Sequence, residues 1–144
     1  MDSYKRHKEV IIIEAEPYYR VSMTYLLSRL GYVVTACSGC DQGGEMVRER
    51  ARRGRPFGLI IVELNQASLA LARALAAAAA EIPMLFTTGS PDHEQLRTCR
   101  SLDMTAVLLK PYSFDEMVRT MAGLQAAPGR REPAGTFAQE RHHD

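Results

Sequence analysis

The chain has 144 residues, which is enough for one ordinary domain and too few for two. Its 18 Lys and Arg residues nearly balance its 17 Asp and Glu residues, so it lacks the basic excess of a dedicated nucleic-acid-binding protein. No apolar run approaches the roughly 20 residues of a membrane helix. The apolar stretch behind the charged N-terminus, 10–13, is too short for a signal peptide. We therefore expect a soluble, cytoplasmic domain without a disulfide framework, since there are only three cysteines.

Short apolar segments recur along the chain and predict strands. The first, Val10-Ile11-Ile12-Ile13, is a continuous β-branched run, which is typical of a strand buried on both faces. Similar runs follow at intervals that leave room for a helix between each pair. In chain order, the expected strands are 10–13, 32–37, 57–62, 84–87 and 105–109.

Helical spacing and terminal signals predict a helix after each strand. Pro17 fits a first helical turn, and Gly31 is a C-terminal cap. The apolar residues that recur at helical spacing between them are Val21, Tyr25 and Leu26, with Leu27 and Leu30. Ser113, with a glutamate three residues on, forms the capping box of the last helix. In chain order, the expected helices are 18–30, 41–52, 67–80, 92–102 and 113–125.

Strict alternation of strand and helix predicts a parallel sheet, because strands joined by helices run in the same direction. All-apolar strands need cover on both faces, which indicates a doubly wound α/β sandwich of five βα units. We expect one domain over 1–125. Beyond Gln125 the composition shifts to Ala, Pro, Gly, Arg and His, so 126–144 is expected to be a mobile tail.

Polar residues follow the expected strands at the edge where such folds bind ligands. Glu14 and Glu16 come after the first strand, Glu63 after the third, Thr88 after the fourth and Lys110 after the fifth. Carboxylates, a hydroxyl and a lysine that converge on one edge form a polar pocket. Such a pocket could bind a cation or hold a carboxylate–lysine ion pair.

The order and spacing of several short motifs resemble the receiver domain of bacterial two-component response regulators, over about residues 8–125. The motifs are 10–17 with Arg20, 30–32, 36–39, 59–64, 82–83 with Thr88, and 109–111 with Phe114. The resemblance implies a flavodoxin-like (βα)5 fold. It also implies transfer of a phosphoryl group from a histidine kinase to an aspartate at the end of the third strand, with Mg²⁺ bound beside it.

Carried over residue by residue, the resemblance places the metal-binding acidic pair on Glu14 and Ala15. It places the phosphoacceptor on Glu63 and the metal-binding carbonyl on Asn65. Glutamate at 63 extends the side chain by about 1.5 Å, and alanine at 15 removes one carboxylate that Mg²⁺ would need. We therefore expect an atypical receiver, or pseudo-receiver, with no metal or cofactor. Weak Mg²⁺ binding at Glu14, Glu63 and Asn65 is expected only if phosphorylation is retained.

The residues that respond to phosphorylation in the family fall on Thr88, Lys110 and Val107. Val107 stands where the family commonly has an inward-turning Tyr or Phe. Without metal, Glu63 is the natural counter-ion of Lys110 and partly imitates a phosphoryl group, which suggests a domain locked in one signalling state. An inert ion pair is the alternative. The Lys110–Pro111 peptide is commonly cis in the family.

The expected function is that of a stand-alone signalling module that acts by protein–protein contact, without aspartyl phosphorylation and without enzymatic activity. By resemblance, a histidine kinase or a downstream protein binds the face of the fourth helix, fifth strand and fifth helix, and a homodimer is compatible with the sequence. Neither a membrane nor nucleic acid is expected as a partner. The alternative in the same family is a phosphorelay receiver that uses Mg²⁺.

A third reading is a thiol redox sensor, because Cys37 and Cys40 form a CxxC motif at the start of a helix. Redox activity needs a lowered thiol pKa, which a helix N-terminus could supply. Zinc would need two more ligands, and only Cys99 and the histidines near the C-terminus are available. The arginine-rich run 48–55 fits a solvated helix C-terminus better than a nucleic-acid site.

Overall fold

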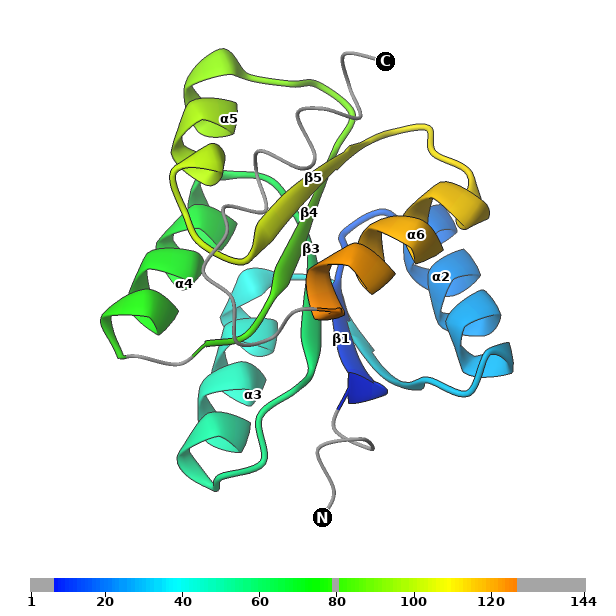
Figure 1. Cartoon of the computed structure of the whole chain (residues 1–144), viewed down its shortest axis with the longest axis horizontal. Coiled ribbons are helices and arrows are strands. Elements are labelled where there is room, and N and C mark those ends of the chain that lie inside the picture. Colours follow the sequence, from blue (N-terminus) through cyan, green and yellow to red (C-terminus); the bar gives the residue numbers. More distant parts are fainter. Residues whose placement is uncertain (1–6, 79–80, 127–144) are drawn as a thin grey trace.

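A computed structural model describes residues 7–78 and 81–126, in which five strands and five helices alternate (Figure 1). The strands are β1 (Glu9–Ile13), β2 (Val33–Cys37), β3 (Leu59–Glu63), β4 (Met84–Thr88) and β5 (Thr105–Leu109). The helices are α2 (Pro17–Arg29), α3 (Cys40–Arg52), α4 (Gln66–Ala77), α5 (His93–Arg100) and α6 (Phe114–Gln125).

All five strands lie parallel in one sheet with the order β2-β1-β3-β4-β5, which confirms the predicted doubly wound α/β architecture. Helices α2 and α6 cover one face of the sheet, and α3, α4 and α5 cover the other (Figure 1). The strand order reverses between β1 and β3. In open α/β sheets, ligands bind outside the carboxyl ends of the strands at such a reversal.

Two apolar layers hold the sheet between its helices. Ile11 and Ile13 of β1 pack on the α3–α4–α5 side, whereas Val10 and Ile12 pack on the α2–α6 side. Successive strand side chains point to opposite faces, so a strand covered on both sides needs apolar residues at every position. This requirement explains the continuous apolar runs in the sequence.

Local signals predicted several helix ends correctly. Pro17 is the first residue of α2, and Gly31 follows that helix with a φ of +92°, a value that favours glycine. The Ser113 hydroxyl caps α6 by accepting a hydrogen bond from the Glu116 backbone N–H at 3.0 Å. The Lys110–Pro111 peptide bond is cis, as the resemblance implies.

Other boundaries differ from the predicted ones. The helix expected over 67–80 ends at Ala77, and 79–80 lie outside the described residues. The third strand begins at Leu59 rather than Phe57, although the Phe57 side chain is buried. The expected tail over 126–144 lies outside the described residues, except for Ala126.

In α2, only part of the apolar pattern expected from the sequence packs on the sheet. Leu27 is buried, together with Met23, whereas Val21, Tyr25 and Leu30 are exposed. Apolar residues occur on both sides of this helix, so periodicity could not show which side faces the core.

Within the described residues, no helix combines the length and apolarity needed to cross a membrane.

Candidate functional site

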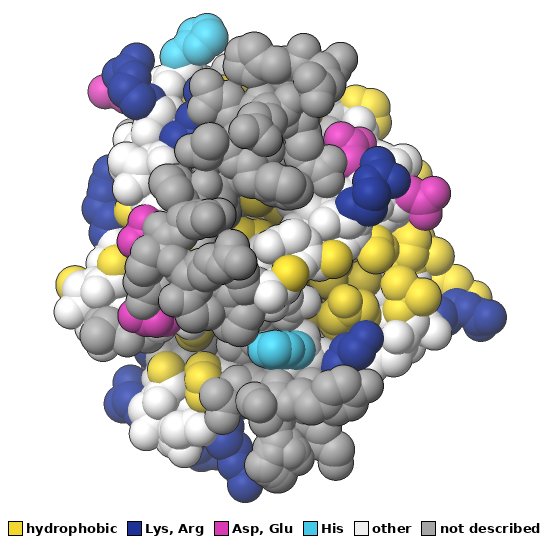
Figure 2. All heavy atoms as spheres, viewed as in Figure 1, with side chains coloured by type: hydrophobic (Ala, Val, Ile, Leu, Met, Phe, Trp, Pro, Cys, Tyr) yellow, Lys and Arg dark blue, Asp and Glu magenta, His cyan; other side chains and the backbone are white. Residues whose placement is uncertain are grey.

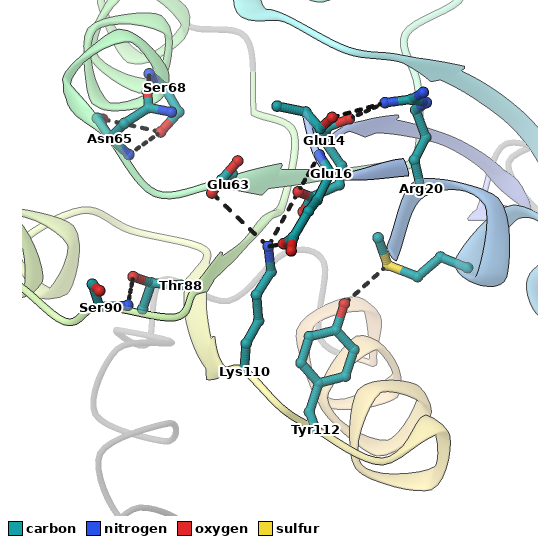
Figure 3. Close-up of polar contacts among 12 residues, drawn as sticks. Glu14, Glu16, Arg20, Glu63, Asn65, Ser68, Thr88, Ser90, Lys110 and Tyr112 are labelled. Carbon is teal, nitrogen blue, oxygen red and sulfur yellow. Dashed lines mark hydrogen bonds and ion pairs between the residues drawn. The ribbon is translucent and has the colours of Figure 1, made fainter. Parts of the chain in front are cut away.

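The carboxyl ends of β1, β3 and β5 bring four charged side chains together (Figure 3). Glu14 and Glu16 follow β1, Glu63 is the last residue of β3, and Lys110 follows β5. β1 pairs directly with β3, and β4 separates β3 from β5. The long Lys110 side chain therefore reaches across the sheet edge toward residues that lie 94 and 96 positions away in the chain.

Lys110 lies among three carboxylates. Its Nζ donates hydrogen bonds to Glu14 Oε2 at 3.1 Å and to Glu16 Oε1 at 3.2 Å. The ion pair expected with Glu63 is present, but its N–O distance of 3.9 Å is the longest of the three. The ammonium is thus held mainly by the two acidic residues after β1.

Glu14 is the most buried of these acids, with 1% of its surface exposed. Its Oε2 accepts hydrogen bonds from Lys110 and from the Glu16 backbone N–H, the latter at 3.0 Å. Arg20 Nη1 donates to the Glu14 backbone carbonyl at 2.8 Å and fixes the turn after β1. The second carboxylate oxygen, Oε1, is buried with no hydrogen-bond partner in the described part of the chain.

The electrostatics of the pocket shift the pKa values of Glu63 and Lys110. Burial and the nearby Glu14 charge raise the pKa of the Glu63 carboxyl, and the attraction of Lys110 only partly offsets them. Burial by itself would lower the pKa of Lys110, but its interactions with Glu14, Glu16 and Glu63 together outweigh that effect and raise it. Lys110 is therefore a cation at neutral pH, and Glu63 ionises less readily than an ordinary glutamate.

Two aromatic residues that the sequence reasoning missed complete the pocket wall. The Lys110 ammonium lies 4.3 Å from the centre of the Tyr19 ring, within cation–π range. The Tyr19 and Tyr112 rings lie 5.4 Å apart, and the Tyr112 hydroxyl contacts the Met23 sulfur. Tyr19 stands three residues after Glu16 in the first turn of α2. That helical spacing could have indicated that it faces the same edge.

Ala15 and Asn65 have other roles in the structure. Ala15 is exposed, and its carbonyl accepts a hydrogen bond from Arg20 at 3.2 Å. Asn65 is the N-cap of α4, where its side chain accepts from the Ser68 backbone N–H at 2.9 Å in a capping box. The Asn65 carbonyl accepts from the Leu69 N–H at 3.0 Å and from the Ser68 hydroxyl at 3.1 Å. Both hydrogen bonds of the Asn65 carbonyl therefore belong to the first turn of α4.

Thr88 and Val107 are both buried, Thr88 in β4 and Val107 in the edge strand β5. Thr88 ends β4, and its hydroxyl accepts a hydrogen bond from the Ser90 backbone N–H at 3.2 Å. Val107 pairs with Phe86 across β4 and β5 and packs in the core on the α3–α4–α5 side. In the described part of the chain, neither side chain hydrogen-bonds to the charged group around Lys110, and Thr88 lies apart from that group in Figure 3.

The CxxC motif lacks the lowered thiol pKa that redox activity needs. Cys37 ends β2 and Cys40 begins α3, as expected, but burial raises the pKa of both thiols. Burial also raises the pKa of Cys99, to about 12. Among residues 7–78 and 81–126, no group of three His, Cys, Asp or Glu side chains is arranged to hold a metal ion.

Acidic side chains neutralise part of the arginine-rich run at the end of α3. Arg50 forms an ion pair with Glu9 of β1. Arg52 and Arg53 both pair with Glu49, one turn earlier in the same helix. The run therefore behaves as the solvated helix end that the sequence indicated.

The chain matches no protein-family model and no curated protein, but many solved structures resemble it. A response regulator receiver protein from Sinorhizobium medicae has a TM-score of 0.71 at 16% identity, over 83% of this chain and 95% of that one. An orphan response regulator of H. pylori gives 0.67 at 17% identity, over 81% and 95% of the two chains. The beryllofluoride-activated NtrC4 receiver domain dimer gives 0.71 at 14% identity, over 85% and 99%.

The chain has the fold of response regulator receiver domains. The pocket around Lys110 lies at the edge of the receiver fold where β1, β3 and β5 end. At these identities the likeness establishes the fold, and the role of the pocket must be argued from its own residues.

Proposed function

We propose that this chain is a signalling module that acts by protein–protein contact and does not cycle through phosphorylation. In receiver domains, by the resemblance described above, an aspartate after the third strand takes the phosphoryl group with the help of Mg²⁺. Here the corresponding pocket holds Lys110 in ion pairs with Glu14, Glu16 and Glu63. These ion pairs support the proposal of a single, fixed signalling state.

The observation that carries the proposal is the position of Lys110. Its Nζ is hydrogen-bonded to Glu14 and Glu16, and its side chain is only 7% exposed. A lysine that is free to bind a phosphoryl oxygen would have to leave these carboxylates. Breaking a buried ion pair leaves an uncompensated charge and costs several kcal/mol.

The donor groups of the pocket do not fit a Mg²⁺ ion. Mg²⁺ prefers octahedral oxygen ligands, and Ala15 supplies no carboxylate. The Asn65 carbonyl is already used by α4. Glu14 and Glu63 remain, with the Lys110 ammonium beside both. Mg²⁺ is commonly held by one or two carboxylates together with several waters; here the Lys110 ammonium already lies beside both carboxylates and would repel a second cation.

The proposed contact surface for a histidine kinase or a downstream signalling protein is formed by α5, β5 and α6, by analogy with receiver domains. β5 leads directly into the pocket, because Lys110 follows its last residue, Leu109, which is partly exposed. The fixed charge pattern around Lys110 would thus hold this face in one conformation.

Intact-mass measurement after incubation with acetyl phosphate and Mg²⁺ tests the proposal. We expect no gain of a phosphoryl group by the natural chain. The Glu63→Asp plus Ala15→Asp double variant restores the family's nucleophile and acidic pair, and we expect it to gain one. The Ala15→Asp single variant is the matched control, since it adds the carboxylate without the aspartate nucleophile.

A phosphoryl group on the natural chain would overturn the proposal and favour the phosphorelay reading. Failure of both the natural chain and the double variant would leave the pocket without a demonstrated link to phosphotransfer. The assignment to signalling would then depend on finding a protein partner.

A further inference from the structure

A groove runs between the ends of α3 and α4. The end of α4 consists largely of alanine, and such small side chains leave space beside the neighbouring helix. The groove has a volume of about 520 Å³, and pockets of roughly 300–1,000 Å³ are typical of small-molecule sites. It opens where α3 and α4 end and where β3 and β4 begin. It therefore lies at the edge of the sheet opposite the Lys110 pocket.

The base of the groove and its α4 side are apolar. Leu75 and Ile82 line it and are buried, with 4% and 7% of their surfaces exposed. Ala74 and Ala78 are exposed and line the α4 side. A molecule in the groove would thus rest on hydrocarbon along its length, which favours an apolar body.

The α3 side of the groove carries positive charge that the fold neutralises only in part. Arg48 and Arg52 line this side and are exposed. Within 7–78 and 81–126, Arg48 forms no ion pair, and Arg52 shares the single carboxylate of Glu49 with Arg53. Figure 2 shows Lys and Arg side chains at the lower left, over the end of α3, beside a few hydrophobic side chains.

Gly44 gives the Arg48 guanidinium its place. A Cβ on Gly44 would lie 3.6 Å from both Arg48 Nη1 and Nη2 and 3.5 Å from Leu71 Cδ1 of α4. The guanidinium therefore lies beside Gly44, on the side of α3 that faces α4. From there its donors can reach an acidic group held between the two helices.

An acidic residue limits the charge of the ligand. Glu81 lines the groove and also the neighbouring hollow between α4 and α5, where Asp103 is a second acid. These carboxylates repel any further anionic group at that end. The groove is therefore suited to a molecule with one negative charge, placed at the α3 side.

We propose that the groove binds a small amphiphilic monocarboxylate, with its acid group on Arg48 and Arg52 and its apolar body against α4. An arginine guanidinium matches a carboxylate in paired hydrogen bonds. Apolar walls that supply contact, with a few polar groups that fix orientation, are typical of small-molecule sites. This inference does not depend on the proposed signalling function, because the groove and the Lys110 pocket lie at opposite edges of the sheet.

Titration of the ¹⁵N-labelled full chain with octanoate, followed by two-dimensional NMR, tests the proposal. We expect saturable shifts of backbone amides in the second half of α3 and at the end of α4, with a Kd of about 1 mM or below. Octan-1-ol has the same apolar body without the charge, and octanedioate adds a second carboxylate. Each should bind at least about fivefold more weakly than octanoate.

Two pairs of variants locate the site. Arg48→Gln should weaken octanoate binding about tenfold, whereas its matched control Arg53→Gln, on the same helix but outside the groove, should leave the Kd nearly unchanged. Ala74→Glu puts a like charge in the groove and should abolish binding. Ala77→Glu is its control, because Ala77 is exposed on α4 but does not line the groove. The same spectra show that each variant is folded.

Three results would overturn the proposal. The first is the absence of saturable shifts with octanoate up to about 20 mM, far above the expected Kd. The second is octan-1-ol binding as tightly as octanoate, since the groove would then recognise apolar surface alone. The third is an equal loss of affinity in Arg48→Gln and Arg53→Gln, which would show a general attraction to positive charge instead of a site.

Discussion

At the scale of single residues, the pocket is organised around the buried carboxylate of Glu14. A buried charge is tolerated only when it is paired and hydrogen-bonded, and Lys110 with the Glu16 backbone N–H provides this for Oε2. Glu63 lies at the side of this arrangement, partly exposed and 3.9 Å from the ammonium. Burial and the repulsion of Glu14 raise the pKa of this carboxyl, because the attraction of Lys110 offsets them only in part.

The raised pKa of Glu63 predicts a pH-dependent effect of Glu63→Gln on stability. The carboxyl contributes most below its unfolded-state pKa of about 4.3, and this contribution is lost as the pH rises through the higher folded-state pKa. Glutamine cannot ionise and avoids the loss. We expect the variant to unfold at a higher urea concentration than the natural chain at pH 7, and the difference to shrink toward pH 4.

The matched control for this prediction is Glu45→Gln, at an exposed position of α3. We expect it to leave the urea midpoint nearly unchanged from pH 4 to pH 8. A Glu63→Gln midpoint below that of the natural chain at pH 7 would show that the Lys110 attraction outweighs burial and the Glu14 charge.

At the scale of elements, α3 contains two adjacent glycines, Gly43 and Gly44, that face different surroundings. A Cβ on Gly43 would lie 2.6 Å from Ile13 Cδ1 and 2.9 Å from the Cys37 sulfur, both in the core. A Cβ on Gly44 would meet nothing closer than Leu71 Cδ1 at 3.5 Å, which is ordinary contact. Only Gly43 is therefore required by the packing of α3 against β1 and β2.

The two glycines predict opposite effects of the same substitution. Gly43→Ala should destabilise the fold, because overpacking costs about 1–3 kcal/mol and exceeds the gain of about 1 kcal/mol in helix propensity. Gly44→Ala keeps that gain and should stabilise the fold by up to about 1 kcal/mol. Urea unfolding of both variants compares them directly. Equal effects would mean that Ile13 and Cys37 move aside freely.

At the scale of the whole molecule, Lys110 joins segments that lie far apart in the chain. It follows β5 near one edge of the sheet and binds the two acids after β1, next to the opposite edge strand. The link therefore exists only when the full sheet is assembled.

Removing the lysine should cost more than removing its exposed partner. Lys110→Met leaves the buried Glu14 carboxylate without a cation, and we expect a loss of about 3 kcal/mol in the free energy of unfolding. Glu16→Gln is the control and should cost less than about 1 kcal/mol, because its carboxylate is exposed. Glu14→Gln combined with Lys110→Met should recover most of the loss. A small effect of Lys110→Met in urea unfolding would contradict the central role of this pair.

The sequence by itself determined the order and type of the elements. The apolar runs of the strands, Pro17 at the start of α2, Gly31 after it and the Ser113 cap act within a few residues of chain. Such local signals can be interpreted without knowing the rest of the molecule. The polar residues at strand ends were equally visible, because a parallel sheet brings all its carboxyl ends to one edge.

Only the tertiary structure decided which of these residues meet. The sequence favoured Glu63 as the partner of Lys110, but strand order and side-chain reach give the hydrogen bonds to Glu14 and Glu16. Both sides of α2 are apolar, so the helix period could not show that Tyr25 faces outward; packing on the sheet made that choice. Pairing across more than 90 residues and the selection between two similar faces are properties of the assembled fold, and no local pattern encodes them.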